Sequence, residues 1–316
     1  MSIDARLPLV SIILPTFNVA VEIARTIETL QQQTLSSLEI LVIDDASTDG
    51  TADVVAAATA GDPRVQLTRL KENRGVQHAR FVGIGQARGA WVGFVDGDDW
   101  VEPQMFARLS EVAQAHQADV AVCDAWHDRL AQQPQRLLRL PGPCIVETPA
   151  ALLEFLVDRR SAVALWNKLF RRERLLPVLE RQREQPWPRI DLMEDKLLCA
   201  AVFAESQRLT YIAEPLYHYV ERPGSAMASF DAARVRTRMA NYALVLGVLQ
   251  EERAAYHPVL AVFVQKTAEI VFDAVTRDIA RLETSAEIRA DLRRERDERF
   301  GRHRWLALRV WLDRLL

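Results

Sequence analysis

Residues 38–51 read LEILVIDDASTDGT, and this stretch decides the fold class. A short, mostly apolar run at 38–43 passes directly into two aspartates and a loop of Ser, Thr, Asp and Gly. A run of this length that ends in turn residues predicts a buried strand. The Ala- and Val-rich residues 51–59 that follow predict a short helix. The stretch therefore predicts a strand, a polar loop and a helix in succession.

The same alternation continues on both sides of this stretch, through the first 125 residues. Further strands are predicted at 10–14 (ending at Pro15), 65–70, 91–95 and 119–123, and further helices after Asn18, at about 75–87 and from Pro103 to His116. We expect Asn18 to cap the first of these helices. Strands that alternate with helices at this spacing form right-handed βαβ units. We therefore predict an α/β fold, with a mostly parallel sheet and helices on both faces.

The second half of the chain has a different pattern. Residues 127–148 are rich in Pro, Gln and Arg and are expected to be irregular; after them come helices near Thr148 and Met193 and a strand at 209–212. From about residue 228 onward no strand pattern remains, and the sequence predicts three or four helices. We therefore predict two parts, an α/β domain at 1–226 and a helical extension at 227–316.

Length, charge and cysteine content exclude several classes of protein. The 316 residues suffice for one large domain with an appended piece. The formal charge is −3, from 40 basic and 43 acidic residues, which argues against a nucleic-acid partner. The three cysteines form no CxxC pair, and the longest apolar runs fall far short of the ~20 residues that span a bilayer. We expect a cytoplasmic protein without a signal peptide or a membrane span.

Polar residues follow three of the predicted strands at their carboxyl ends. PTFN (15–18) follows the first strand, DDAS (44–47) the second and DGDDW (96–100) the fourth. In an open parallel sheet these ends share one rim, where ligands bind. The sequence therefore predicts a site on this rim that contains two acidic clusters.

The cluster Asp96-Gly97-Asp98-Asp99 places three carboxylates within four residues. They repel one another unless a cation neutralises them. Hard carboxylate oxygens suit Mg²⁺ or Mn²⁺, and Mg²⁺ typically takes one or two such ligands together with phosphate oxygens. The alternative is an acidic turn in which Asp98 or Asp99 caps a following helix. The position on the rim favours the metal.

The pair Asp44-Asp45 also has two interpretations. It can form an Asx turn that organises the loop up to Gly50, or it can accept hydrogen bonds from a nucleotide base or a ribose. One residue can serve each purpose.

The glycine-rich stretch 83–89 does not fit a dinucleotide site, because Arg88 takes the third glycine position and the stretch precedes a strand.

Seven motifs in this order resemble those of the inverting family-2 glycosyltransferases, which have the Rossmann-like GT-A fold. They are PTFN, IDDASTDGT, NRGVQHAR, VDGDDW, NKLF, MEDK and YHYVERPGS, and the match covers roughly residues 8–225. The resemblance implies that a sugar moves from a nucleotide diphosphate sugar, by default a UDP-sugar, to a hydroxyl of a glycan or lipid-linked acceptor. It also implies Mn²⁺ or Mg²⁺ as cofactor and a role in the synthesis of cell-surface polysaccharide or glycolipid.

The resemblance also assigns roles to individual residues. The implied nucleotide contacts are Pro15, Thr16, Asn18, Asp44 or Asp45, Arg80 and Asp96, and the implied metal ligands are Asp96 and Asp98. Asp195 of the MEDK motif is implied to be the catalytic base, with Glu194 as the reserve candidate. Arg80 matches an Arg that the family usually follows with Asn, and Phe81 stands at that place here.

The segment YHYVERPGS (217–225) resembles a loop that closes over the diphosphate. The family often carries Arg directly after the aromatic pair; Val220 stands there, which leaves Arg222 or His218 for the diphosphate. A single His beside two Tyr is more often a packed, hydrogen-bonded residue, and this interpretation of His218 stands beside that of a third metal ligand. We expect Trp166 in the core and Trp100 at the rim of the site.

The chemistry of an inverting transfer agrees with these roles. The reaction needs a base for the acceptor hydroxyl and a means to neutralise the departing diphosphate. Asp195 begins an apolar helix, which would fix its carboxylate at the wall of the site. The alternative for Asp195 is an ordinary first-turn acid that the helix dipole favours.

Other classes explain the sequence less completely. A sugar nucleotidyltransferase should have a glycine-rich, Arg-containing loop after the first strand, and PTFNVA has no glycine. A glycoside hydrolase needs two carboxylates and no metal, which leaves an acidic cluster unexplained. A nucleotide-sugar-binding protein without catalytic activity is a further alternative, against which the complete acidic motifs count.

The C-terminal segment is basic. Residues 289–316 contain nine Arg and five acidic residues, and 302–316 place Trp305, Leu308 and Leu312 on one helical face. A basic amphipathic helix with Trp suits the surface of an anionic membrane, here the inner membrane. The alternative is a helix that packs on the α/β domain. Peripheral contact with the membrane would suit an enzyme that acts on a lipid-linked acceptor.

Overall fold

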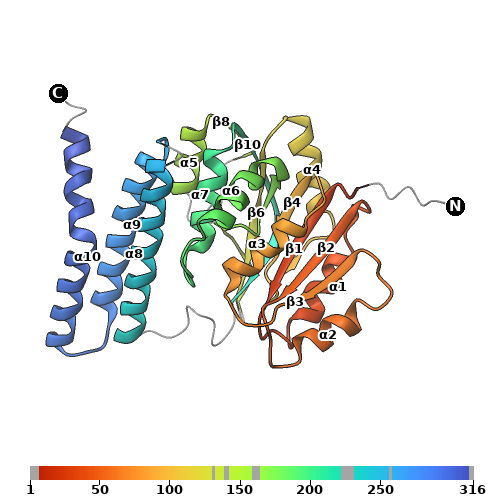
Figure 1. Cartoon of the computed structure of the whole chain (residues 1–316), viewed down its shortest axis with the longest axis horizontal. Helices are drawn as coiled ribbons and strands as arrows, with labels where there is room; N and C mark the ends of the chain where they lie inside the picture. The colour runs from red at the N-terminus through yellow and green to blue at the C-terminus, as the bar shows by residue number, and fades with distance from the viewer. Residues whose placement is uncertain are drawn as a thin grey trace.

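The computed structural model describes residues 7–129, 132–138, 142–158, 164–221, 231–255 and 258–312, with side chains except those of 157, 158 and 302–312. In this part of the chain a ten-stranded sheet lies between two layers of helices, and three long helices stand beside it (Figure 1). Each layer of the fold is formed by residues that are far apart in the sequence.

Six strands of the sheet run in the same direction. They are β1 (Val10–Thr16), β2 (Leu38–Asp44), β3 (Val65–Arg69), β4 (Trp91–Phe94), β6 (Val120–Asp128) and β10 (Arg208–Val220). Four shorter strands run in the opposite direction: β5 (Trp100–Val101), β7 (Gln135–Arg136), β8 (Cys144–Glu147) and β9 (Lys168–Arg171). The order is β3-β2-β1-β4-β9-β6-β10-β5, with β7 beside β6 and β8 beside β10. The predicted mostly parallel sheet is confirmed.

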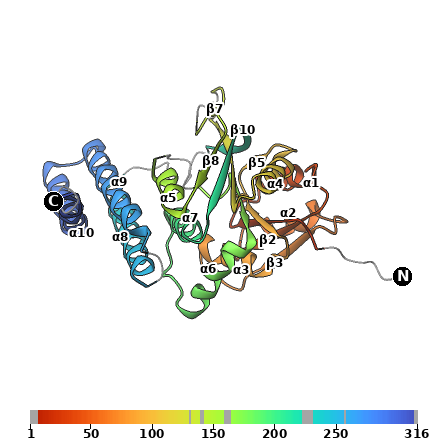
Figure 2. The ribbon, with the colours of Figure 1, turned by 90° about the horizontal axis from the view of Figure 1, so that it is seen from above.

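Helices cover both faces of the sheet (Figure 2). One face carries α1 (Ile23–Gln31), α2 (Thr51–Ala58) and α4 (Met105–Ala115); the other carries α3 (Val76–Gln86), α5 (Pro149–Asp158), α6 (Arg172–Glu184) and α7 (Glu194–Ala204). Successive side chains of a strand point to opposite faces. Ile12 and Leu14 accordingly join the core under α1 and α4, and Ile13 joins the core under α3. This double burial explains why the parallel strands read as continuous apolar runs.

The predicted helical extension consists of α8 (Ala232–Ala255), α9 (Leu260–Arg281) and α10 (Ala286–Leu312). Val245, Leu249 and Phe263 belong to the same core cluster as α7, so α8 and α9 pack directly on the α/β part. Other side chains of the three helices form a cluster of their own. Among the described residues, no helix has the length and apolar composition needed to cross a membrane. The side chains of 302–316, on which the membrane prediction rests, lie outside the described residues.

Several local predictions are wrong. Asn18 does not cap α1: the residue at the N-cap is Glu22, and Asn18 lies in the preceding loop with a φ of 51°. β1 continues through Pro15 to Thr16, because Pro15 lies beyond the last pair between β1 and β4, where a missing N–H breaks no ladder bond. The residues after Asp99 form β5, so neither Asp98 nor Asp99 caps a helix. The stretch 127–148, expected to be irregular, contains β7 and β8.

Candidate active site

A cavity of about 370 Å³ opens at the carboxyl ends of β1, β2 and β4. Its wall combines the three predicted rim loops with the start of α3 and the segment before α7. The lining residues are Pro15, Thr16, Phe17, Val19, Asp45, Asn73, Gly75, Val76, Ala79, Arg80, Asp96, Gly97, Asp98, Arg189, Asp191 and Glu194. The fold therefore brings the predicted acidic clusters together around one cavity, which we call the donor cavity.

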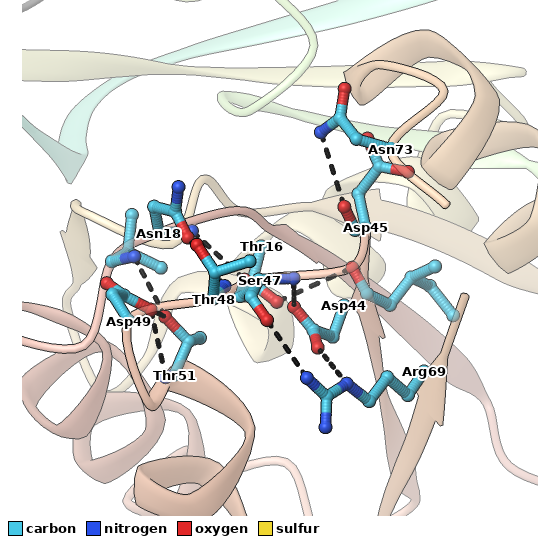
Figure 3. A network of polar contacts seen from close by, with 12 residues as sticks. Thr16, Asn18, Asp44, Asp45, Ser47, Thr48, Asp49, Thr51, Arg69 and Asn73 are labelled. Carbon is cyan, nitrogen blue, oxygen red and sulfur yellow. Dashed lines mark hydrogen bonds and ion pairs between the residues drawn. The ribbon is translucent and has the colours of Figure 1, made fainter. Parts of the chain in front are cut away.

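The two aspartates after β2 have different surroundings (Figure 3). The carboxylate of Asp44 is fully buried, accepts a hydrogen bond from the Ser47 N–H at 3.1 Å and lies 3.3 Å from Nε of Arg69. The carboxylate of Asp45 accepts the N–H groups of Arg74 at 2.9 Å and Gly75 at 2.7 Å, and it lines the donor cavity. Asp44 thus organises the turn, and Asp45 faces the space where a ligand would lie.

Asn18 joins two rim loops and is not among the residues that line the donor cavity. Its N–H donates to Oγ of Ser47 at 3.0 Å, and its Oδ1 accepts the N–H of Thr48 at 2.9 Å (Figure 3). Because both bonds run from the loop after β1 to the loop after β2, Asn18 fixes the distance between them. Its predicted role as a nucleotide contact remains a prediction.

The guanidinium of Arg80 is the centre of a buried ion cluster. It donates to Glu194 at 2.9 Å, to Asp96 at 3.1 Å and to Asp195, and its side chain is only 4% exposed. α3 and the first turn of α7, more than 100 residues apart, are tied together by these bonds. Arg80 therefore holds both candidate bases in place. Glu194 lines the donor cavity, and Asp195, which is not among the lining residues, contacts Arg80 within the cluster.

Burial and neighbouring negative charge shift the pKa values of the acids in this cluster. Burial, together with the nearby Asp195 and Asp98 carboxylates, raises the pKa of Asp96 to about 6 against the attraction of Arg80. Burial and the neighbouring Asp195 raise the pKa of Glu194 to about 7. Burial lowers the pKa of the Arg80 guanidinium, but Asp195, Asp96 and Glu194 together raise it above its usual value. Three carboxylates thus share one guanidinium.

Asp99, the third aspartate of the DGDD loop, connects this loop to β10. Asp99 is buried, and its carboxylate accepts the hydroxyl of Tyr217 at 2.6 Å and the N–H of Val220 at 2.8 Å. The Tyr217 hydroxyl also accepts the N–H of Asp96 at 3.1 Å. Burial, with Asp98 and Asp96 nearby, raises the pKa of Asp99 well above its usual value. Tyr217 on β10 therefore fixes the loop that presents Asp96 and Asp98, a role that nothing in the sequence pattern predicted.

The donor set of this loop fits a divalent cation. Asp98 lines the cavity beside Asp96 and Glu194, and Arg80 is the guanidinium that contacts Asp96, Glu194 and Asp195. Within the described ranges, no group of three or more His, Cys, Asp and Glu side chains forms a ready-made metal site. A Mg²⁺ or Mn²⁺ ion that takes one or two carboxylates and completes its shell with phosphate oxygens and water needs no such group.

His218 lies on β10, paired with Trp100 on β5. Its ring nitrogens lie 3.0 Å from a carboxylate oxygen of Asp128 and 3.1 Å from one of Glu102, and its ring stacks on Trp100 with centroids 3.3 Å apart. Neither His218 nor Trp100 lines the donor cavity. The structure thus places His218 as the packed, hydrogen-bonded interpretation expects. Trp100 directly follows the rim loop 96–99 but does not line the donor cavity.

Two further predictions concern residues near β10. Trp166 is buried and stacks on Tyr217 with ring centroids 4.3 Å apart, as expected for a core residue. Arg222, the predicted diphosphate contact, lies outside the described residues. Its role remains a prediction.

The segment before α7 contributes two charged residues that sequence analysis missed. Arg189 and Asp191 line the donor cavity and form an ion pair at 2.9 Å. The segment is held by α8, because the N–H of Asp191 donates to Oδ1 of Asn241 at 3.0 Å and Nε1 of Trp187 donates to Glu252 at 3.1 Å. These residues lie in a Pro-rich stretch without periodicity, so only the tertiary structure shows that they reach the site.

Solved structures share this architecture. Staphylococcus aureus TarS in complex with UDP-GlcNAc superposes with a TM-score of 0.59, covering 93% of this chain and 89% of TarS at 18% identity. The mannosyltransferase PcManGT from Pyrobaculum calidifontis, in complex with GDP-Man and Mn²⁺, gives a TM-score of 0.54 over 96% of this chain and 84% of PcManGT, also at 18% identity. The fold is the GT-A fold of glycosyltransferases, as the motifs predicted.

Sequence comparison then assigns the family. The profile described as Glycosyl transferase family 2 matches residues 11–186. The uncharacterized glycosyltransferase EpsJ of Bacillus subtilis (strain 168) is 34% identical over 69% of this chain, and the succinoglycan biosynthesis protein ExoO of Rhizobium meliloti (strain 1021) is 33% identical over 70%. The chain spans 63% of the length of each of these relatives. It belongs to glycosyl transferase family 2.

Proposed function

We propose that this chain transfers a sugar from a nucleotide diphosphate sugar to an acceptor hydroxyl, with inversion at the anomeric carbon. One observation carries the proposal: Asp45, Asp96, Asp98, Arg80 and Glu194 line one cavity, and Asp195 forms an ion pair with Arg80. Membership of family 2 supports it. The name of ExoO, a succinoglycan biosynthesis protein, supports polysaccharide assembly as the setting.

The nucleotide would lie along the first two rim loops. Asp45 keeps acceptor capacity beyond its two backbone N–H bonds, so it can receive an N–H of a base or a hydroxyl of a ribose. Pro15 and Thr16, on the neighbouring strand end, line the same space. The complexes of TarS with UDP-GlcNAc and of PcManGT with GDP-Man support a nucleotide sugar as donor, with UDP-sugars as the first to test.

Asp96 and Asp98 would hold Mn²⁺ or Mg²⁺ against the diphosphate. When bound, the metal neutralises charge on the departing nucleoside diphosphate. Binding of the cation would also offset the burial and the repulsion from Asp195 and Asp98 that raise the pKa of Asp96. The Mn²⁺ in the PcManGT complex supports a divalent metal here.

Asp195 would act as the base. The acceptor hydroxyl gives its proton to the Asp195 carboxylate, its oxygen bonds to the anomeric carbon, and the bond from this carbon to the diphosphate oxygen breaks with its electron pair on the diphosphate. Arg80 fixes the Asp195 carboxylate through an ion pair. Glu194, with its pKa raised to about 7, is the reserve base.

A panel of nucleotide sugars, titrated with and without Mn²⁺, tests these roles. We expect Asp195→Asn to bind the donor with nearly wild-type affinity and to lose transfer, because only the proton acceptor is removed. We expect Asp98→Ala to lose the Mn²⁺-dependent part of donor binding. Full transfer activity in Asp195→Asn would contradict the base assignment. Donor binding without any transfer by the wild type would favour the non-catalytic alternative.

A further inference from the structure

A second cavity, of about 700 Å³, lies next to the donor cavity between α3 and α6. Asn73 and Arg189 line both cavities, so the two spaces are neighbours across these residues. We call the second one the α3–α6 groove. None of the predicted site residues lines it, and the proposed donor chemistry does not use it.

One wall of the groove is aromatic and held in position. The rings of Trp187 and Phe81 meet edge to face with centroids 5.7 Å apart. The indole N–H of Trp187 is bonded to Glu252, and its backbone N–H donates to Oε1 of Gln182 at 2.9 Å. An indole fixed in this way offers an ordered apolar surface at little entropic cost, which suits the C–H face of a sugar ring.

The groove also has unused hydrogen-bonding capacity. Oε1 of Gln77 on α3 and Nε2 of Gln182 on α6 are buried and have no hydrogen-bond partner among the described residues. One is an acceptor and the other a donor, and a hydroxyl can serve both kinds of group. Buried polar atoms without partners cost stability, so a ligand that supplies hydroxyls after a small rotation of these amides would gain binding energy.

The charge of the groove is the opposite of that of the donor cavity. Its lining contains Arg74, Arg183 and Arg189 but only one acid, Glu72. Arg74 and Arg183 are exposed, and neither forms an ion pair with a described residue. Arg74 and burial together lower the pKa of the neighbouring His78, with burial the larger cause. The groove therefore favours an anionic ligand, and guanidinium groups bind carboxylates in a bidentate manner.

We propose that the α3–α6 groove binds the acceptor as an acidic glycan chain. The inference rests on the proposed function. The end of the glycan that receives the sugar lies in the donor cavity, and the rest of the glycan continues past Asn73 and Arg189 into the groove. Sugar rings pack on Trp187, and their carboxylates bind Arg74 and Arg183. The acidic glycan is thus an acceptor substrate whose acidic units bind away from the hydroxyl that reacts.

Calorimetric titration of the full chain with two probes of equal length tests this. We expect tetragalacturonate, an acidic tetrasaccharide, to bind at least tenfold more tightly than neutral maltotetraose. Arg183→Gln should weaken tetragalacturonate binding roughly threefold to fivefold, as expected for the loss of one exposed charge pair, and Arg74→Gln should do the same. The matched control is Arg281→Gln on α9, an exposed Arg outside the groove, which should bind as the wild type does.

Equal affinity for the two tetrasaccharides would overturn the inference, as would wild-type binding of tetragalacturonate by both groove variants. Mn²⁺-dependent donor binding, measured on the wild type and on Arg183→Gln, distinguishes a failure of the groove assignment from a failure of the proposed function. Its absence in the wild type would contradict the proposed function. Its presence in both, with no preference for the acidic probe, would contradict only the assignment of the groove.

Discussion

Replacement of Arg80 by Met should destabilise the fold strongly and in a pH-dependent way. The Arg80 side chain is 4% exposed, and its guanidinium contacts three carboxylates from two other segments of the chain. Met replaces the aliphatic part of the Arg side chain but not the guanidinium, so the main loss is the counter-charge of Asp96, Glu194 and Asp195. Removal of one partner of a buried ion pair costs about 3–5 kcal/mol. For a chain of this size we therefore expect a loss of about 10 °C in Tm at pH 8.

The pH dependence follows from the raised pKa values. The pKa of Asp96 is about 6 and that of Glu194 about 7, both above the value of an unfolded carboxyl group, so the folded chain binds these protons more tightly. Ionisation of the two groups lowers the stability of the fold as the pH rises through about 7. Without Arg80 the ionisation of these carboxyl groups destabilises the fold more. The loss in Tm of Arg80→Met should therefore be smaller at pH 5.5 than at pH 8.

Thermal unfolding followed by circular dichroism at the two pH values measures both effects. Arg80→Lys is the matched control, since it keeps the positive charge but loses the several planar N–H donors of the guanidinium. We expect its loss in Tm to be about half that of the Met variant. An unchanged Tm in Arg80→Met, or a deficit that does not depend on pH, would refute the view that Arg80 neutralises this cluster.

Two further predictions concern the packing around the donor cavity. Tyr217→Phe removes the hydroxyl that joins Asp99 to the N–H of Asp96, so we expect a loss of about 1–3 kcal/mol in urea unfolding and weaker Mn²⁺ binding by calorimetry. Wild-type Mn²⁺ affinity would show that the loop keeps its shape without Tyr217. Gly83→Ala would place a Cβ 2.5 Å from Cγ2 of Ile13, where α3 crosses β1. We expect a loss of about 1–3 kcal/mol from overpacking, with no loss for Gly142→Ala, where nothing lies within 4 Å.

The sequence predicted the central part of the fold well, because long apolar runs end in polar loops there. The strands at 38–43 and 91–95 correspond closely to β2 and β4. Prediction failed where an element is too short to show a period. β9, four residues long, is antiparallel to both neighbours, and β5 and β7 have two residues each. The pairing of these strands depends on their position in the sheet, which the local sequence does not encode.

The sequence predicted most residues of the candidate site but not the role of each one. The sequence could not distinguish the roles of Asp44 and Asp45, and their contacts in the folded chain differ: Asp44 bonds to its own turn, and Asp45 lines the cavity. Arg80 and Asp195 are both predicted site residues, yet their mutual contact joins positions 115 residues apart. Such contacts are set by the packing of α3 against α7, so only the folded chain shows them.

The most direct test of the central claim is ¹H NMR of the sugar released when the chain hydrolyses a nucleotide sugar with Mn²⁺ present. Water takes the place of the acceptor hydroxyl, so no acceptor has to be known. For an α-linked UDP-sugar we predict that the β-anomer appears first and that Asp195→Asn releases none. Appearance of the α-anomer first, or release of no sugar from any donor of the panel, would contradict an inverting transfer at this site.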